Sequence, residues 1–287
     1  MSAPLGRHHT GDDMRLSFTP CEGPGLSVFD PIERHQYTLG MSSQVDPRPA
    51  SDDCFTFPVD DAVAFSVEHV DLPPSVGVYV HDADNEVVAE AVNGMPVMLP
   101  EATYTLELTT AVKTYLQVTA PVEVFPESEG SRISFDGPIE VVLGARSRHE
   151  RPAATVTTTT DPEDVMTAVS YLGSALKTTT AERSYPTLRG HPPLVEVGDE
   201  LSVPDGIQRP ETGITIELPP SYDYIYPAAP LAYYLGADVV PGDRPRIRTD
   251  TGYSFDLDGI EGFERTVERV LKQVFLLDCV VRTEGLY

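Results

Sequence analysis

Apolar and polar residues alternate with a period of two over most of the first half of the chain. The alternation runs from Val76 to Val80, passes a polar turn at 82–85 and resumes through Ala91. Alternating runs on both sides of an Asx-rich turn predict a β-hairpin. Further alternating runs follow at 102–110, 111–125, 131–135 and 139–144. Short strands at this spacing, separated by Gly and Pro, predict an antiparallel β-sandwich.

A helical period replaces this alternation in the second half. Asp161 is expected to cap a helix that begins at Pro162. The apolar face of this helix consists of Val165, Ala168, Leu172 and Leu176. The run "AAPLAYYLGAD" predicts a short helix closed by Gly236.

A last helix is expected to begin at Asp258, with Glu261 as its capping-box partner. Its apolar face then consists of Ile260, Phe263, Val267, Val270, Leu271 and Val274.

These patterns predict an α+β fold, with an N-terminal antiparallel β-sandwich followed by a smaller mixed α/β region. Residues 1–13 have the composition of a disordered tail, and residues 14–145 form the β-sandwich domain. Residues 146–162 are a connecting segment that includes a threonine run. Residues 163–287 form the mixed α/β domain.

The charge of the chain is strongly acidic. Asp and Glu number 45 against 20 Lys and Arg, which gives a net charge of −25, and the lysines are Lys113, Lys177 and Lys272 alone. Such a surface repels itself in dilute buffer, whereas at 1 M salt the Debye length of about 3 Å screens the repulsion. We therefore expect a salt-adapted cytoplasmic protein. The start has no apolar signal-peptide core, and no apolar run approaches the ~20 residues of a membrane span.

Cysteine and histidine spacing gives no sign of a metal or cofactor. Cys21, Cys54 and Cys279 form no CxxC pair, which argues against a disulfide framework or a zinc ribbon. The phosphate-loop, dinucleotide and GxSxG patterns are also missing. We therefore predict no cofactor and no metal.

The triplet Asp250-Thr251-Gly252 matches the catalytic triplet of aspartic proteases. Two such triplets must face each other for two carboxylates to share one proton, and the chain contains no second one. The triplet is therefore interpreted as a turn between two short strands.

A cysteine-dependent hydrolase is an alternative, with Cys279 as nucleophile and His191 as base. Cys279 lies within "FLLDCVV", which is expected to be buried, and a buried cysteine usually serves packing alone.

Arginines gather in a few segments, where two interpretations compete. They either pair with the many carboxylates and join the two halves of the chain, or they bind an external anion such as nucleic acid. The net charge opposes phosphate backbones, so internal pairing is favoured. The arginines are Arg146, Arg148, Arg151, Arg183 and Arg189, with a further group at 244–248.

Asp278 is the single charge in the apolar run 274–281. Its helical phase points the carboxylate into the apolar face, where a lone charge is costly. We expect an arginine from one of the loops, at 146–148 or 183–189, to pair with Asp278 in preference to Arg282.

Three blocks of the second half resemble an uncharacterised family of salt-adapted haloarchaeal acidic proteins. They are "GARSRHERPAATVTTTTDPEDVMTAVSYLGSALKTTTAERSYPTLRGHPP", "APLAYYLGAD" and "LKQVFLLDCVVRTEGLY". The resemblance implies no activity and no site residues. It implies that such proteins run longer, so that this chain is a front portion of one.

The sequence therefore favours a cytoplasmic binding or regulatory module without its own catalysis. A partner protein or a missing C-terminal region is expected to contact it. The alternatives are the hydrolase, the front part of a larger enzyme, and an arginine-mediated nucleic-acid binder.

Overall fold

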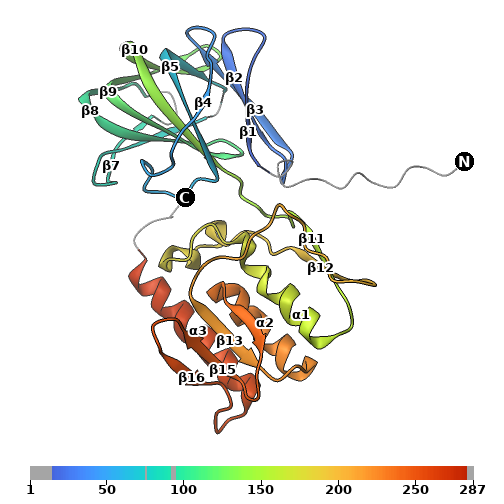
Figure 1. Cartoon of the computed structure of the whole chain (residues 1–287). Coiled ribbons are helices and arrows are strands. Elements are labelled where there is room, and N and C mark those ends of the chain that lie inside the picture. Colours follow the sequence, from blue (N-terminus) through green and yellow to red (C-terminus); the bar gives the residue numbers. More distant parts are fainter. Residues whose placement is uncertain (1–14, 75, 92–94, 283–287) are drawn as a thin grey trace, which may run out of the picture. The chain divides into compact units, whose positions relative to one another are not determined.

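The computed structural model describes residues 15–74, 76–91 and 95–282 (Figure 1). The predicted tail at 1–13 lies outside these residues. The described chain forms two compact units, one of residues 15–148 and one that begins at His149. The first contains only strands, and the second mixes strands and helices. The α+β prediction is therefore confirmed.

The first unit is built from one hydrogen-bonded sheet with strand order β1-β2-β3-β5-β10-β9-β8-β6-β7, and β4 pairs with β5. All pairs among these described strands are antiparallel. The strands are β1 Ser17–Pro20, β2 Gly25–Asp30, β3 His35–Met41, β4 Arg48–Pro49, β5 Asp61–Leu72, β6 Val78–His81, β7 Val87–Ala91, β8 Val97–Leu108, β9 Lys113–Glu127 and β10 Gly130–Arg146.

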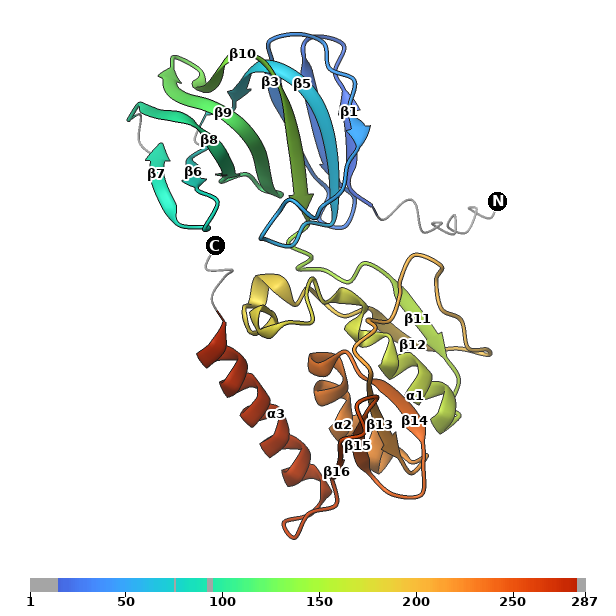
Figure 2. The same cartoon turned by 60° about the vertical axis from the view of Figure 1, so that its left-hand side comes forward.

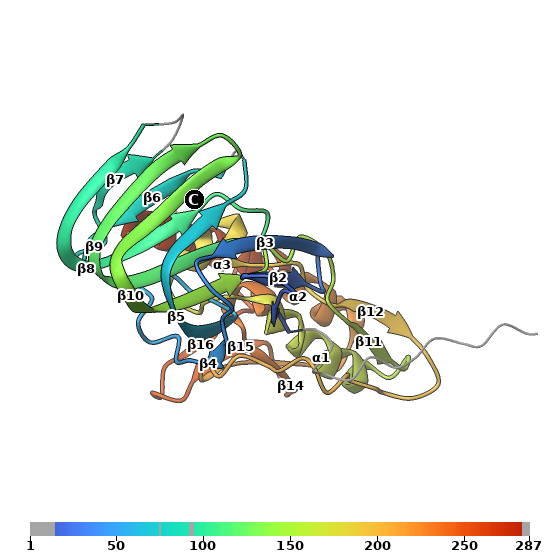
Figure 3. The same cartoon turned by 90° about the horizontal axis from the view of Figure 1, so that it is seen from above.

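This sheet folds over onto itself, as Figure 3 shows. Leu26 on β2 and Val80 on β6 lie far apart in the strand order, yet both belong to one buried apolar core. Register shifts between Ser134 and Ile139 of β10 interrupt its pairing with β5, and such irregularities let a long strand bend. The predicted hairpin is confirmed as β6 and β7, whereas the runs at 131–135 and 139–144 belong to the single strand β10.

The second unit contains two small sheets. Strands β11 (Thr155–Thr158) and β12 (Leu194–Val197) are parallel. The other sheet has the order β14-β13-β15-β16, with β13 and β14 parallel and the remaining pairs antiparallel. Its strands are β13 Ile214–Leu218, β14 Asp238–Pro241, β15 Arg246–Thr249 and β16 Ser254–Asp256.

Three α-helices share one apolar core with the four-stranded sheet. They are α1 Pro162–Ser170, α2 Tyr222–Leu235 and α3 Phe263–Val281, and α2 lies between the other two (Figure 2). Short 3₁₀ turns follow α1 at 172–175, 181–184 and 186–188, so the predicted continuation of this helix through Leu172 and Leu176 is wrong. Ile216 and Leu218 of β13 point into the core, so the alternate residues Thr215 and Glu217 lie on the opposite face of the sheet.

The helix starts test the capping predictions. The cap of α1 is confirmed, because the Asp161 side chain accepts a hydrogen bond from the Glu163 amide and Pro162 is the first helical residue. Helix α2 starts six residues before the predicted segment, at Tyr222, and ends at left-handed Gly236 as expected. The free energy gained by burying its apolar face offsets the cost of the two prolines inside the helix.

The predicted start of α3 at Asp258 is wrong. The helix begins at Phe263, because Gly262 adopts a positive φ of 92° and its amide donates to the Gly259 carbonyl in a turn. Gly259 contacts Thr266 so closely that a Cβ there would lie 2.5 Å from the threonine hydroxyl oxygen. Ile260 is consequently outside the helix and fully exposed.

Candidate functional site

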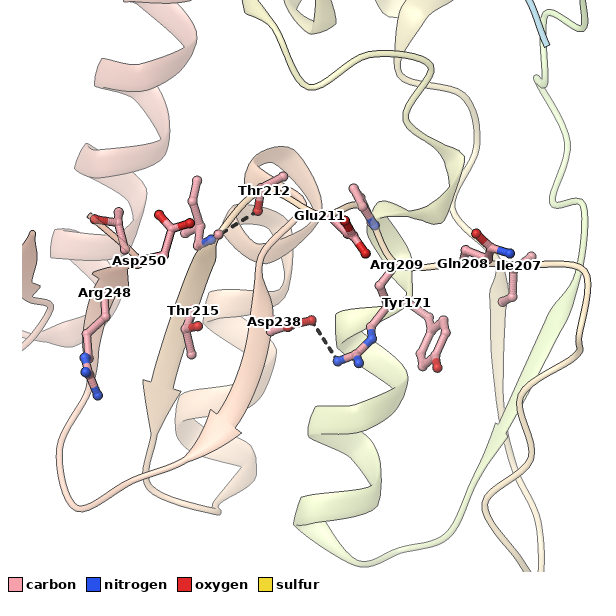
Figure 4. Close-up of a pocket in the computed structure, with 14 residues that line it drawn as sticks. Tyr171, Ile207, Gln208, Arg209, Glu211, Thr212, Thr215, Asp238, Arg248 and Asp250 are labelled. Carbon is pink, nitrogen blue, oxygen red and sulfur yellow. Dashed lines mark hydrogen bonds and ion pairs between the residues drawn. The ribbon is translucent and has the colours of Figure 1, made fainter. Parts of the chain in front are cut away.

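A pocket of about 690 Å³ lies at one end of the four-stranded sheet (Figure 4). It sits at the amino ends of the parallel strands β13 and β14 and at the carboxyl end of β15. The loop before β13 and the end of α1 complete it. The lining residues are Tyr171, Ile207, Gln208, Arg209, Pro210, Glu211, Thr212, Gly213, Ile214, Thr215, Asp238, Arg248, Thr249 and Asp250.

Glycines set the position of the loop that lines this pocket. Gly213 has a φ of +67°, and its carbonyl accepts the amide of Asp250, so loop and turn meet closely. A Cβ at Gly213 would lie 2.5 Å from the Asp250 carboxylate. Thr212 donates its hydroxyl to the carbonyl of Gly236, which fastens the loop to the end of α2. The backbone of Asp250 is therefore fixed at the rim, beside Gly213.

Both arginines of the lining are already held by carboxylates. Arg209 donates to Asp238 at 2.8 Å, and its guanidinium lies 5.5 Å from the centre of the Tyr171 ring. Arg248 donates at 2.7 Å to Glu217, which lies outside the pocket. Hydrogen bonds from Arg246 and then Arg248 lower the pKa of the Glu217 carboxyl below its ordinary value.

Two carboxylates of the lining remain available to a ligand. The side chains of Glu211 and Asp250 are exposed, and neither has a hydrogen-bond or ion-pair partner within the described part of the chain. The lining carries three carboxylates and two arginines, so its net charge is −1. Such a site suits a hydrophilic ligand that brings a positive charge and hydrogen-bond donors.

No histidine, cysteine or lysine is among the described residues of this lining. Its neutral polar side chains are the amide of Gln208 and the hydroxyl groups of Tyr171, Thr212, Thr215 and Thr249. They can orient a ligand, and within the described chain none of them is hydrogen-bonded to a carboxylate of the lining.

The two residues suggested for hydrolysis are not joined by any hydrogen bond in the described chain. A ring nitrogen of His191 lies 2.7 Å from the carbonyl oxygen of its neighbour Pro192, and Cys279 lies on α3. The expectation that Cys279 sits in a buried run is wrong. Cys279 is half-buried, and four of its neighbours from Leu276 to Val281 are more than half exposed, because α3 extends beyond the core. The hydrolase stays an untested alternative.

The aspartic-protease interpretation of Asp250 has no support in the geometry. Residues 250–253 turn the chain from β15 into β16, with Gly252 at a φ of +90°. Asp250 is exposed in that turn, as the sequence predicts. Its contribution is to line the pocket, which the motif alone did not reveal.

Asp278 has the kind of partner that its position predicted. Arg183 of the 181–184 turn donates Nε to its Oδ2 at 2.9 Å, and Tyr234 of α2 donates to the same oxygen at 2.8 Å. The pair is mostly buried, with side-chain exposures of 10% and 13%. Arg282 instead donates to Ser184. The ion pair therefore fastens a loop to α3 within the second unit.

The other selected arginines have varied surroundings. Arg189 lies 5.8 Å from the centre of the Phe275 ring, and Arg146 is buried with its guanidinium donating to the Pro58 carbonyl. Arg151 has an interaction partner, and Arg148 is exposed. In the 244–248 group, Arg246 and Arg248 both bind Glu217. Each of these contacts lies within one unit, so they pair several arginines internally but do not join the two halves of the chain.

A buried ionic cluster in the first unit was missed by the sequence analysis. Glu107 of β8 accepts from Lys113 of β9 and lies 3.2 Å from the His81 ring of β6. All three are buried, and Phe57 packs against the His81 ring. Burial alone would raise the pKa of Glu107, but the hydrogen bonds from His81 and Lys113 outweigh it, so the pKa is lowered. A lysine on an alternating strand of a lysine-poor chain was the available signal.

Two buried nitrogen atoms near the cluster have no hydrogen-bond partner among the described residues. They are Nδ1 of the His81 ring and Nε of Arg146. Burial lowers the pKa of Lys113, which the Glu107 carboxylate partly offsets. The cluster is therefore an electrostatically costly feature of the first unit.

Comparison of the chain with protein-family models, with curated proteins and with solved structures finds no match. Among the described helices, none has the length and apolar character needed to cross a membrane. Within the same residues, no group of three or more His, Cys, Asp or Glu side chains is arranged to hold a metal ion.

Proposed function

We propose that the chain is a salt-adapted cytoplasmic module that binds a small cationic ligand in the pocket beside β13 and β15, without chemistry of its own. The observation that carries this proposal is the pair of free carboxylates, Glu211 and Asp250, at the rim of a 690 Å³ polar pocket. The chain already shows how a cation is held there. The guanidinium of Arg209 lies over Tyr171 and binds Asp238, which combines a cation–π contact with a charge-assisted hydrogen bond.

Composition supports the salt-adapted and cytoplasmic parts of the proposal. The net charge of −25 with only three lysines suits a surface screened by concentrated salt. The three cysteines are all free in the structure, which fits a reducing compartment.

The test uses agmatine, which carries a guanidinium and an ammonium group, and glutarate as a dianion of similar size. Ligand-observed NMR with the full chain should show binding of agmatine and none of glutarate. The double variant Glu211→Gln/Asp250→Asn should lose that signal while its Tm stays unchanged, because both side chains are exposed. Glu200→Gln, an exposed carboxylate outside the lining, is the matched control. Preference for glutarate, or agmatine binding that survives the double substitution, would refute the proposal.

A further inference from the structure

Helix α3 has two different faces. Val267 and Val270 are buried against the core of the second unit, and Leu271 and Val274 pack partly against it. The opposite face points away from α2 and changes character along its length. Its first half is charged, and its second half is apolar.

The apolar half exposes several large side chains within two turns. Leu276 is 62% exposed and Val280 is 72% exposed, and Leu277, about 100° further round the helix, is 62% exposed. Contiguous exposed apolar side chains on a protein surface usually mark an interaction site.

The charged half of the same face forms a shallow groove of about 380 Å³ that ends at Leu276. Its lining carries three cations, Arg265, Arg269 and Lys272, against two carboxylates, Glu261 and Glu268. The groove therefore has a net charge of +1 in a chain whose net charge is −25. It is a local positive surface that attracts carboxylates.

The spacing of these residues suits another helix. Arg265, Arg269, Lys272, Leu276 and Val280 follow one another at intervals of three or four residues, and therefore form one ridge along α3. An amphipathic helix packs against such a ridge through side chains at the same intervals. Its apolar side chains would cover Leu276 and Val280, and its carboxylates would meet the cations.

We propose that this face of α3, from Arg265 to Val280, is a docking surface for an acidic amphipathic helix of a partner protein. A second copy of the chain is a poorer occupant. Its own α3 would place the same three cations opposite these three, and like charges that face each other repel. The surface is separate from the pocket, so it does not depend on the proposed ligand.

The test uses the full chain and a fluorescein-labelled helical peptide with leucines at i, i+3, i+4 and i+7, flanked by glutamates. Fluorescence anisotropy should show saturable binding of this peptide and not of a control in which every glutamate is lysine. The variant Leu276→Glu/Val280→Glu should weaken binding at least tenfold. Arg269→Glu should weaken it several-fold, and more at low salt than at high salt. Val197→Glu, which changes an exposed valine on β12, should leave binding unchanged.

Three results would overturn the proposal. One is the absence of saturable binding, or binding that the α3 variants do not change. Another is a dimer in sedimentation experiments that the Leu276→Glu/Val280→Glu variant abolishes, which would make a second copy the occupant. The last is a large fall in Tm of that variant, which would show that the face is covered within the chain itself.

Discussion

The buried cluster around Glu107 makes the sharpest stability prediction. In Glu107→Gln, the ammonium group of Lys113 loses its carboxylate partner while it stays buried. Breaking a buried ion pair by removing one partner typically costs about 3–5 kcal/mol, because the remaining charge is not compensated. For a unit of this size, about 3 °C of Tm corresponds to each kcal/mol, so we expect a fall of roughly 10 °C.

The comparison variants separate the lost charge from general damage to the core. In Glu107→Gln/Lys113→Met no unpaired lysine remains, so the double variant should be more stable than Glu107→Gln alone. Glu140→Gln removes the partner of Arg48 in an exposed pair and should cost less than about 1 kcal/mol.

The assay is urea unfolding followed by circular dichroism, with calorimetry for Tm. The reasoning fails if Glu107→Gln costs less than about 1 kcal/mol, the range of an exposed pair. It also fails if adding Lys113→Met gives no recovery, because the unpaired cation would then not be the source of the loss.

Three further outcomes follow from the charges. Asp278→Ala should lower the free energy of unfolding by about 3 kcal/mol, since it leaves Arg183 largely buried without its acceptor, and an unchanged urea midpoint would contradict this. Tm should rise from about 0.1 M to 2 M KCl as carboxylate repulsion is screened, and a flat or falling series would count against salt adaptation. The pKa values of Glu107 and Glu217 are lowered in the folded state. The stabilisation that the two carboxylates contribute is therefore complete above the unfolded-state pKa of about 4.3, and it is lost as the pH falls through the folded-state values. Urea midpoints that hold steady to pH 2 would be inconsistent with both pKa shifts.

Local patterns predicted what local physics determines. The two alternating runs on either side of a polar turn identified β6 and β7. The residues Asp161 and Pro162 identified the start of α1. The helical phase of Asp278 was enough to predict an arginine partner, because a lone charge on an apolar face has few low-energy alternatives.

What the sequence did not reveal depends on contacts between distant segments. The pocket combines a loop, the ends of three strands and Tyr171, and the triplet that contains Asp250 gave no sign of it. The run that contains Cys279 has the composition of a core helix, and only the three-dimensional position of α3 shows that it extends past the core. Helix α3 begins after the predicted residue because Gly259 and Gly262 form a turn, which is favoured over the predicted capping box.

The position of β10 in the sheet has a consequence for biosynthesis. It is the last of the ten strands to leave the ribosome, yet it lies between β5 and β9 and joins the two halves of the sheet. Until Arg146 has emerged, β5 and β9 each present an unpaired edge, and such edges recruit strands from other chains. Pairing of Ser131 with Leu72 also closes a long loop, which slows folding. Nascent chains that stall before the end of β10 are therefore the species most exposed to aggregation, and expression fragments that stop short of Arg146 should be recovered mainly as insoluble protein.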